Sequence, residues 1–392
     1  MPWNHNDLTE RTGTEAHPAV QLALTSYTTP WNNQEHVIFV DPEGQVHELF
    51  YDGTNWIPNN LSTLASELPR ASPRLPARPD VIVGYGSDWD EQQHIVYIDM
   101  AGNINRLHFD GSWHHINFAD VLQPSDLTRW GLPAVQGMLT AYHTPWSQQH
   151  HIFYFGESGA LIHEMYISGD QLHPNNLTPP NLATSPLGGM RGYTTPWDDQ
   201  QHVVVVTPGS YIYEIYNDGE WRNNVLGTDP HASRAGHNRA IHSHLTISNR
   251  QQHVIYVDNF NHIQELVHSG EAGNWTPNDL TQLATITNGG NPVGVAGSPG
   301  GGEDRSVNSY TTLWNGQQHV NYVDSLGFIN ELYYDDGSWR HNNLTTLAPG
   351  AENAKSISGG IAIAGHATDW NNQQHVFYIG GDGHIHELYY SD

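Results

Sequence analysis

The chain repeats a set of aromatic and polar residues whose types could hold a sugar. The peptide SYTTPWNNQEHVIFVD (26–41) returns with variation as AYHTPWSQQHHIFYF, GYTTPWDDQQHVVVV and SYTTLWNGQQHVNYVD. In each copy a Trp is followed by Gln three residues later and by His five residues later. An indole can cover the apolar face of a pyranose, and hydroxyl and amide groups can hydrogen-bond its hydroxyls. The set therefore indicates carbohydrate recognition, with one candidate pocket in each copy.

Seven copies carry this set, and its positions can be counted from the Trp. Six copies carry the Trp, at Trp31, Trp89, Trp146, Trp197, Trp314 and Trp370. In the fifth copy Ser248 replaces it. Gln follows three residues later, at Gln34, Gln92, Gln149, Gln200, Gln317 and Gln373 in these copies. A hydroxyl lies two residues before the Trp, at Thr29, Ser87, Thr144, Thr195, Thr312 and Thr368.

Two further positions complete the predicted site. An aromatic ring lies four residues before the Trp, at Tyr27, Tyr85, Tyr142, Tyr193 and Tyr310, with His244 and His366 in the fifth and seventh copies. A small residue lies five before it, at Ser26, Gly84, Ala141, Gly192, Ser309 and Gly365. We expect the ring to line the pocket and the small residue to leave room for the sugar at its floor.

Each position also has a structural interpretation. An indole in a loop-like stretch is a liability unless it binds something, so we favour ligand contact for Trp31 and its equivalents. The repeated Gln and His could instead hold hydrogen bonds between units, because buried polar groups must be paired. A carboxylate before a Leu, as in Glu48, recurs in six copies, with Arg106 in the second, and could serve a turn or a ligand. A second recurring Trp, as in Trp56, is expected to pack.

Catalytic and metal chemistry find less support. An enzyme gathers an acid, a base and a nucleophile at one place, whereas these polar residues are spread evenly over the copies. No copy carries the carboxylate pair of a glycosidase, and no G-x-S-x-G, H-E-x-x-H or phosphate-binding motif is present. We therefore expect no enzyme, no cofactor and no metal site. The His pairs at 114–115 and 150–151, and His242 with His244, are kept as metal candidates only.

The spacing of the copies predicts the fold. The His that follows the Gln recurs every 51 to 66 residues through the whole chain. Each unit reads as four short strands separated by turn residues, and four-stranded sheets repeated around an axis form a β-propeller. The last unit lacks a fourth strand, but Trp3, Asn6 and Leu8 match the spacing of Trp56, Asn59 and Leu61. We predict an all-β, seven-bladed propeller of antiparallel blades in one domain (1–392), closed by the N-terminal strand in blade seven. The segments 66–80 and 284–307 are expected to be connecting loops.

Composition excludes several function classes. The 392 residues contain 14 basic and 41 acidic side chains, a net charge of -27, so nucleic acid and anionic membranes would be repelled. No apolar run is long enough to insert into a membrane. The N-terminus shows no basic and apolar leader, so we expect synthesis in the cytoplasm without a signal peptide.

The motif W-x-x-Q-x-H-V, followed by D-x-x-G-x-I-x-E-L-Y-Y and W-x-x-N-N-L, resembles the bacterial seven-bladed β-propeller lectins of the Photorhabdus type. That resemblance implies multivalent binding of L-fucose and related sugars, including O-methylated or galactose-type ones, in pockets between blades without a metal. It also implies a dimer or tetramer, fucosylated glycans and free monosaccharides as partners, and release to act on host glycans. The sequence is more distantly similar to six-bladed fungal fucose lectins. The fifth unit departs from the pattern, so we expect its pocket to be weak or empty. The alternatives are a propeller that serves as a protein-interaction scaffold and, third, a glycan hydrolase.

Overall fold

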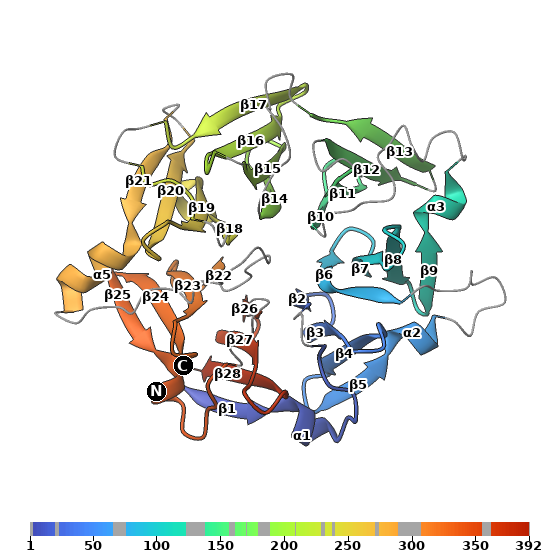
Figure 1. Cartoon of the computed structure of the whole chain (residues 1–392), viewed down its shortest axis with the longest axis horizontal. Helices are drawn as coiled ribbons and strands as arrows, with labels where there is room; N and C mark the ends of the chain where they lie inside the picture. Colours follow the sequence, from blue (N-terminus) through green and yellow to red (C-terminus); the bar gives the residue numbers. More distant parts are fainter. Residues whose placement is uncertain are drawn as a thin grey trace.

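A computed structural model describes residues 3–19, 23–65, 76–122, 138–156, 161–169, 171–178, 189–207, 209–228, 232–236, 240–270, 274–288, 307–354 and 362–391. They form seven four-stranded antiparallel sheets arranged in a ring, which confirms the predicted seven-bladed propeller (Figure 1). The first strand of each sheet lies at the centre of the ring and the fourth at the outside. In the described part of the chain, no helix is long and apolar enough to cross a membrane.

The strands of blades one to four follow the chain in order. They are β2 (Leu24–Thr29), β3 (Gln34–Val40), β4 (Val46–Tyr51) and β5 (Trp56–Asn60); β6 (Ala77–Ser87), β7 (Gln92–Asp99), β8 (Ile104–Phe109) and β9 (Trp113–Asn117); β10 (Leu139–Thr144), β11 (Gln149–Phe155), β12 (Ile162–Ser168) and β13 (Gln171–Asn176); β14 (Met190–Thr195), β15 (Gln200–Val206), β16 (Ile212–Asn217) and β17 (Trp221–Leu226).

Blades five and six continue this order, and blade seven joins the two ends of the chain. The strands are β18 (Ile241–Thr246), β19 (Gln251–Val257), β20 (Ile263–Ser269) and β21 (Thr276–Asp279); β22 (Val307–Thr311), β23 (Gln318–Val323), β24 (Ile329–Asp335) and β25 (Ser338–Asn343); β26 (Ile363–Thr368), β27 (Gln373–Ile379), β28 (Ile385–Ser391) and β1 (Asn4–Asp7).

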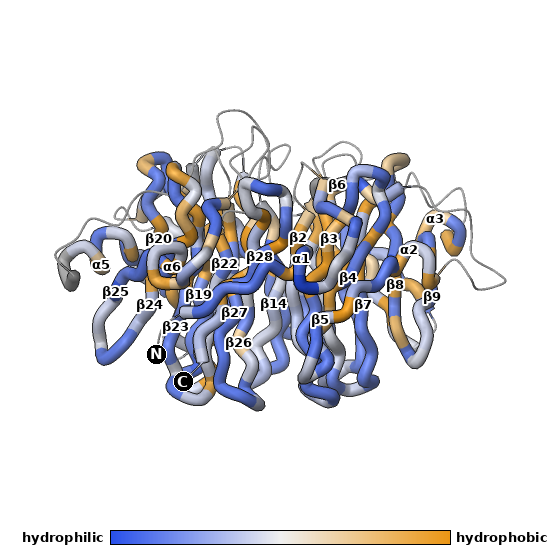
Figure 2. Tube along the Cα trace, turned by 90° about the horizontal axis from the view of Figure 1, so that it is seen from below, coloured by the Kyte–Doolittle hydropathy of each residue, from blue (hydrophilic) through white to orange (hydrophobic). Residues whose placement is uncertain are grey.

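The N-terminal strand closes the ring as the sequence predicted. Strand β1 pairs antiparallel with β28, with Asn6 opposite Glu387 and Asp7 opposite His386. The outer edge of β28 is therefore covered by the chain's own start, which leaves blade seven with the same four strands as the others. Both termini lie on the lower rim in Figure 2. Because strands alternate in direction, the loops that join first to second strands lie on that rim as well.

Short helices follow the fourth strands, and the sequence analysis did not predict them. They are α1 (Leu8–Thr12), α2 (Leu61–Leu64), α3 (Phe118–Val121), α5 (Leu280–Asn288) and α6 (Leu344–Leu347). An Asn or Asp at the end of the strand caps the helix: the Asn60 side chain accepts a hydrogen bond from Thr63 N, and Asp7 accepts one from Glu10 N. The Leu of the N-N-L motif then begins the helix fully buried, as at Leu61.

Both predicted connecting loops include residues that belong to a neighbouring helix or strand in the structure. Helix α5 continues to residue 288, inside the predicted loop 284–307, because T-Q-L-A-T-I-T extends the helix started by Leu280. Strand β6 starts at residue 77, inside the predicted connector 66–80. Val307, the last residue of the second predicted loop, already belongs to β22. Residues 66–75 and 289–306 of the two connectors lie outside the described part of the chain.

The apolar core lies between blades rather than within one of them. Each hydrophobic cluster combines residues of two neighbouring sheets, as when Ile98 of blade two packs with Leu139 and Tyr154 of blade three. The second strand is buried on both faces over almost its whole length, and the third strand over its first four residues, as in β3 and β4. The core of the ring therefore lies in the contacts between neighbouring blades, which we call seams.

Candidate functional site

The repeated Trp lies on the tight loop between the first and second strands. The residue two positions after it has a positive φ in every blade: Asn33, Glu91, Gln148, Asp199, Arg250, Gly316 and Asn372. This left-handed residue turns the chain back within the loop. The six Trp side chains are half-buried, as are the Gln residues three positions later. A Cβ on Gly86 of blade two would lie 3.1 Å from Cη2 of Trp31, so that indole lies across the seam on the next blade.

A chain of hydrogen bonds, which we call the relay, crosses the strands of six blades. In blade one, His36 Nε2 contacts Thr29 Oγ1 at 3.0 Å, His36 Nδ1 contacts Glu48 Oε1 at 2.9 Å, and Asn59 donates to Glu48 Oε2 at 2.8 Å. Across the six blades, the His–Glu distances are 2.7 to 2.9 Å. The relay therefore accounts for the repeated hydroxyl, His, Glu and Asn as buried polar groups that pair with one another.

The relay also orients the Gln beside the Trp. In blade one, Thr29 Oγ1 donates to Asn32 Oδ1, and Asn32 Nδ2 donates to the Gln34 amide oxygen at 2.9 Å. The same Asn-to-Gln bond recurs in blades five, six and seven. The oxygen of each of these amides accepts from the Asn, so its NH2 group is the end that a ligand would meet; in blade six this NH2 group also donates to Asp335 Oδ1 at 2.7 Å.

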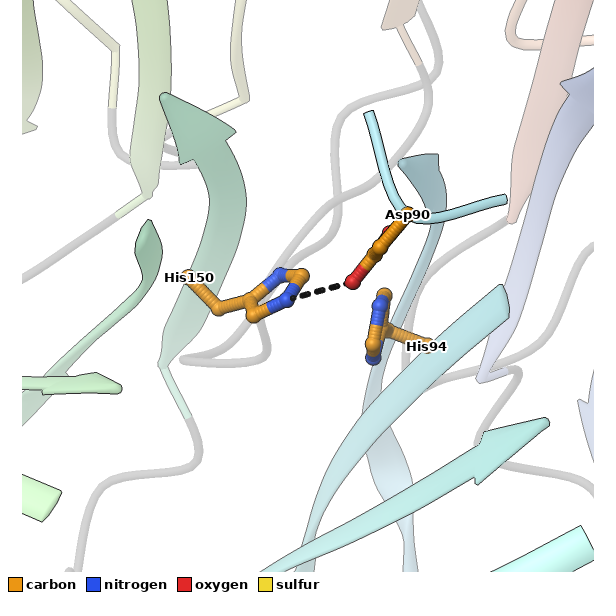
Figure 3. A group of neighbouring side chains, drawn as sticks. All are labelled: Asp90, His94 and His150. Atoms are coloured by element: carbon orange, nitrogen blue, oxygen red, sulfur yellow. Dashed lines mark ion pairs between the residues drawn. The ribbon is translucent and has the colours of Figure 1, made fainter. Parts of the chain in front are cut away.

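Blade two replaces the Glu of the relay with Arg106. The Arg106 guanidinium donates to His94 Nδ1 from Nε at 3.1 Å and from NH2 at 2.8 Å. Nδ1 is thus an acceptor, and the neutral ring carries its proton on Nε2. Burial and the neighbouring Arg106 charge lower the pKa of His94 well below its usual value. Asp90 and His150 lie beside His94 (Figure 3). A cation there would face a guanidinium and a protonated Nε2, so this trio is a poor metal site although its residue types suit one.

The aromatic ring four residues before the Trp lies in the seam. Tyr27 is buried, stacks on His36 with ring centroids 4.8 Å apart, and donates its hydroxyl to Gln93 Oε1 of the next blade at 3.0 Å. Tyr142, Tyr193 and Tyr310 donate to Gln201, Gln252 and Gln374 in the same way. Burial raises the pKa of each of these tyrosines, so the hydroxyl stays protonated and able to donate.

The small residue five before the Trp makes room for that ring. A Cβ on Gly84 would lie 2.7 Å from the Tyr27 ring, and one on Gly192 would lie 2.5 Å from the Tyr142 ring. The space that the sequence analysis assigned to a sugar is therefore filled, at these two positions, by a tyrosine of the preceding blade. Steric fit between blades explains the small side chains there.

Three pockets lie at equivalent seams. The pocket between blades six and seven has a volume of about 380 Å³ and is lined by Trp314, Asn315, Gln317, His319, Glu331, Tyr333, Asn342, Leu347, Gln374, Tyr390 and Trp3. Its walls are aromatic residues of both blades, and its polar groups come from the Trp loop and the relay. That combination of flat apolar walls with a few fixed donors and acceptors is what a small polar ligand needs.

The other two pockets vary this plan. Between blades seven and one, a pocket of about 210 Å³ is lined by Asn6, Arg11, Glu35, Tyr51, Trp56, Gln373, His375, Glu387 and Tyr389. Between blades two and three, a pocket of about 430 Å³ is lined by Trp89, Gln92, Arg106, His108 and His150, with apolar walls that include Phe118, Ile167 and Leu172. This pocket differs chemically from the other two because Arg106 replaces the third-strand Glu and His108 replaces the third-strand Tyr.

The seam between blades seven and one brings two carboxylates together. His375 Nδ1 contacts Glu387 Oε1 at 2.8 Å and Glu35 Oε2 at 3.1 Å, and His366 Nε2 contacts Glu35 Oε2 at 3.3 Å. Burial alone would raise the pKa of Glu35, but the charge of His375 and the hydrogen bond from His366 lower it overall. One oxygen each of the two carboxylates thus lies within 4.8 Å of the other, although no single copy carries both. Glu35 and Glu387 belong to different units and meet only through ring closure.

The predicted site residues thus separate by placement. Among them, Trp89, Trp314, Gln92, Gln317 and Gln373 line described pockets. The hydroxyls Thr29, Ser87, Thr144, Thr195, Thr312 and Thr368 are fully buried, and the tyrosines lie within seams. The sequence analysis missed Trp3 and Trp56, the third-strand tyrosines and the fourth-strand Asn residues as pocket walls. Their regular recurrence in E-L-Y-Y and W-x-x-N-N-L was the available signal.

The similarity of this chain to known proteins lies in its fold. The sequence matches no protein-family model and no curated protein. Among solved structures, the chain is similar to the BP39L lectin from Burkholderia pseudomallei, with a TM-score of 0.65 and 15% identity over 95% of this chain and 96% of that one. It is also similar to an Aleuria aurantia lectin variant in complex with alpha-methyl-L-fucoside, with a TM-score of 0.51 and 15% identity over 87% of this chain and 100% of that one. At these identities the likeness is one of fold.

Proposed function

We propose that the protein is a multivalent lectin that binds sugars in the pockets between neighbouring blades. The observation that carries this proposal is the recurrence of one pocket plan at the seam six–seven and, varied, at two other seams. Each pocket pairs aromatic side chains with a Gln that follows the repeated Trp by three residues. The relay holds the polar groups in place before any ligand arrives, which lowers the entropic cost of binding.

L-Fucose is the first ligand to test, with galactose-type and O-methylated sugars next. Support comes from the family resemblance and from fold neighbours described as fucose-specific or in complex with fucosides. Six blades carry the Trp, and Ser248 stands in its place in blade five. We propose up to seven quasi-equivalent sites, with a weak or empty one at the seam that Ser248 faces and a different preference at the Arg106 pocket.

Isothermal titration with L-fucose and then galactose tests the proposal. The variant Trp314→Ala removes the indole of the pocket between blades six and seven, and Ser248→Ala is its matched control because it changes the same loop position where no indole exists. Loss of the stacking contact is expected to weaken that one site by about 2 kcal/mol, roughly 30-fold, which lowers the fitted number of sites per chain. Ser248→Ala is expected to titrate like the parent.

Two outcomes would count against a lectin. An absence of heat with every monosaccharide would favour a protein-interaction scaffold. Release of free sugar from an aryl fucoside or galactoside, abolished by Glu35→Gln, would favour a hydrolase that uses the carboxylates at the seam seven–one. We further propose that the lectin acts outside the cell on host glycans as a dimer or tetramer, and light scattering measures that assembly state.

A further inference from the structure

A second cluster of ionisable residues lies at the outer side of blade seven, away from the relay. It contains Asp7 at the end of β1, Asp382 in the turn before β28, and His384 and His386 at the start of that strand. His384 Nδ1 is 2.7 Å from Asp7 Oδ2 and 3.5 Å from Asp382 Oδ2. His386 Nε2 is 3.1 Å from Asp382 Oδ1. One ligand atom each of Asp7, Asp382 and His386 therefore lies within 4.8 Å of the other two, and His384 lies beside them against Asp7.

The equivalent positions of blade five keep one His–Asp pair of this cluster but not the second histidine. There, His262 Nδ1 contacts Asp279 Oδ2 at 2.8 Å, as His384 contacts Asp7. However, the place of His386 is taken by Gln264, and its partner Asp258 accepts hydrogen bonds from Gln264 and from backbone N–H groups. The counterpart holds one His–Asp pair and a carboxylate already committed to its turn.

A glycine makes the blade-seven arrangement sterically accessible. Gly380 stands where four other blades carry an Asp in the turn after the second strand: Asp41, Asp99, Asp258 and Asp324. A Cβ on Gly380 would lie 2.4 Å from His386 Nε2 and 2.7 Å from Asp382 Oδ1. The carboxylate of this blade comes instead from Asp382, two residues later, which brings it close to both histidines.

We propose that Asp7, Asp382 and His386 form a site for a divalent transition-metal ion, with Zn²⁺ as the best fit and with His384 holding the Asp7 carboxylate from the side. Zinc takes nitrogen and carboxylate ligands in a tetrahedron at about 2.0–2.2 Å, so neighbouring ligand atoms stand roughly 3.3 Å apart. The spacing of 3.1 Å between Asp382 Oδ1 and His386 Nε2 is close to that value. Two carboxylates with neutral imidazoles give a charge of -2, which one such ion neutralises. Calcium, which prefers six to eight oxygens, is a poor match.

The surroundings support ligation. His5 Nε2 lies 2.9 Å from His386 Nδ1, so the remote nitrogen of His386 is held and its Nε2 is presented to the cluster. Asp7 Oδ1 accepts from Glu10 N at 2.9 Å, which fixes that carboxylate. Such outer contacts orient metal ligands. The side chains of His384, Asp7 and Asp382 are 29%, 18% and 36% exposed, so an ion can enter from solvent.

The cluster at the seam seven–one is a weaker candidate. Glu35, His366, His375 and Glu387 are accounted for there as ion pairs, and the His375–Glu387 contact repeats the relay of five other blades. At the outer cluster, by contrast, a bound ion would join Asp7 to residues that lie more than 370 positions later in the chain. Metal binding would therefore fasten the N-terminal strand to blade seven and stabilise ring closure.

The test uses the tag-free full chain, stripped of metal, with Zn²⁺ measured by competition against a chromophoric chelator and Co²⁺ as a spectroscopic probe. His386→Gln gives blade seven the residue of blade five, and His262→Gln is the matched control. We expect the parent and His262→Gln to bind one Zn²⁺ per chain, and His386→Gln to bind it at least 10-fold to 100-fold more weakly, about the loss that outer contacts alone can cause.

Stability gives a second readout that surface histidines would not produce. Zn²⁺ is expected to raise the Tm of the parent and to slow protease cleavage before residue 19, and to do neither in His386→Gln or in Asp382→Asn, which keeps the side-chain volume. Circular dichroism without metal checks that each variant is folded. The proposal is overturned if the parent shows no saturable Zn²⁺ site, or if His386→Gln and Asp382→Asn bind Zn²⁺ as the parent does.

Discussion

The relay makes a quantitative prediction about stability that can be separated from sugar binding in blade five. There, Glu265 accepts from His253 Nδ1 at 2.8 Å and from Asn278 Nδ2 at 2.7 Å, but Ser248 replaces the indole. Blade five therefore keeps the relay without the residue expected to stack on a ligand. Replacing Glu265 by Leu removes the acceptor of both bonds and should leave the number of sugar sites unchanged.

The expected loss in free energy of unfolding follows from the polar groups that Glu265→Leu leaves without a partner. His253 is 2% exposed, so its Nδ1–H would be left unpaired away from water at a cost of about 1–3 kcal/mol. Asn278 is half-buried and can turn to water, so its lost bond adds about 1 kcal/mol. We expect Glu265→Leu to lower the free energy of unfolding by roughly 2–4 kcal/mol. Glu265→Gln keeps one acceptor for His253 and should cost about half as much.

Urea unfolding followed by tryptophan fluorescence and circular dichroism measures these values. The control is Glu220→Leu, which removes an exposed carboxylate and should change stability by less than about 0.5 kcal/mol. The double variant His253→Leu/Glu265→Leu should cost less than the sum of the single changes, because neither partner is then left unpaired. A loss below about 1 kcal/mol for Glu265→Leu, or an additive double variant, would refute the structural role of the relay.

Three further predictions concern the seams. Gly192→Ala places a Cβ 2.5 Å from the Tyr142 ring and should lower the free energy of unfolding in urea by about 1–3 kcal/mol. The comparison variant is Gly219→Ser, which lies in an open turn with a positive φ and meets no such clash. A larger loss for Gly219→Ser than for Gly192→Ala would contradict the packing argument. Tyr193→Phe removes the 2.9 Å hydrogen bond to Gln252 and should lower the free energy of unfolding by about 1 kcal/mol. An unchanged free energy of unfolding would show that water replaces the hydroxyl and that this bond adds no stability. Burial and the Arg106 charge lower the pKa of His108 to about 3, so below about pH 6.5 the unfolded chain binds more protons and stability falls as pH decreases. His108→Phe, the residue of blade one, should reduce that fall in Tm between pH 7 and pH 4, and an unchanged pH profile would contradict it.

The internal repeat is the feature that the sequence by itself determined, down to the exchange of Tyr for His at position 366. The repeat and its period were visible in the printed chain, so the number of blades, the four strands in each and the completion of blade seven by residues 4–7 followed directly. A period of this kind is local information, because each unit carries its own turns and strand pattern. The replacements Ser248, Arg106 and His366 were visible in the same way.

Only the tertiary structure decided which repeated residues face a pocket and which face a neighbouring blade. Both kinds recur with the same period, since every seam is built like the next, and periodicity therefore does not separate Tyr27 in a seam from Trp314 in a pocket. The pairing of Tyr27 with Gln93, of Glu35 with His375, and of Asp7 with His384 joins residues of different units. Such contacts depend on how one twisted sheet packs on the next and on where the ring closes, and no single unit encodes them.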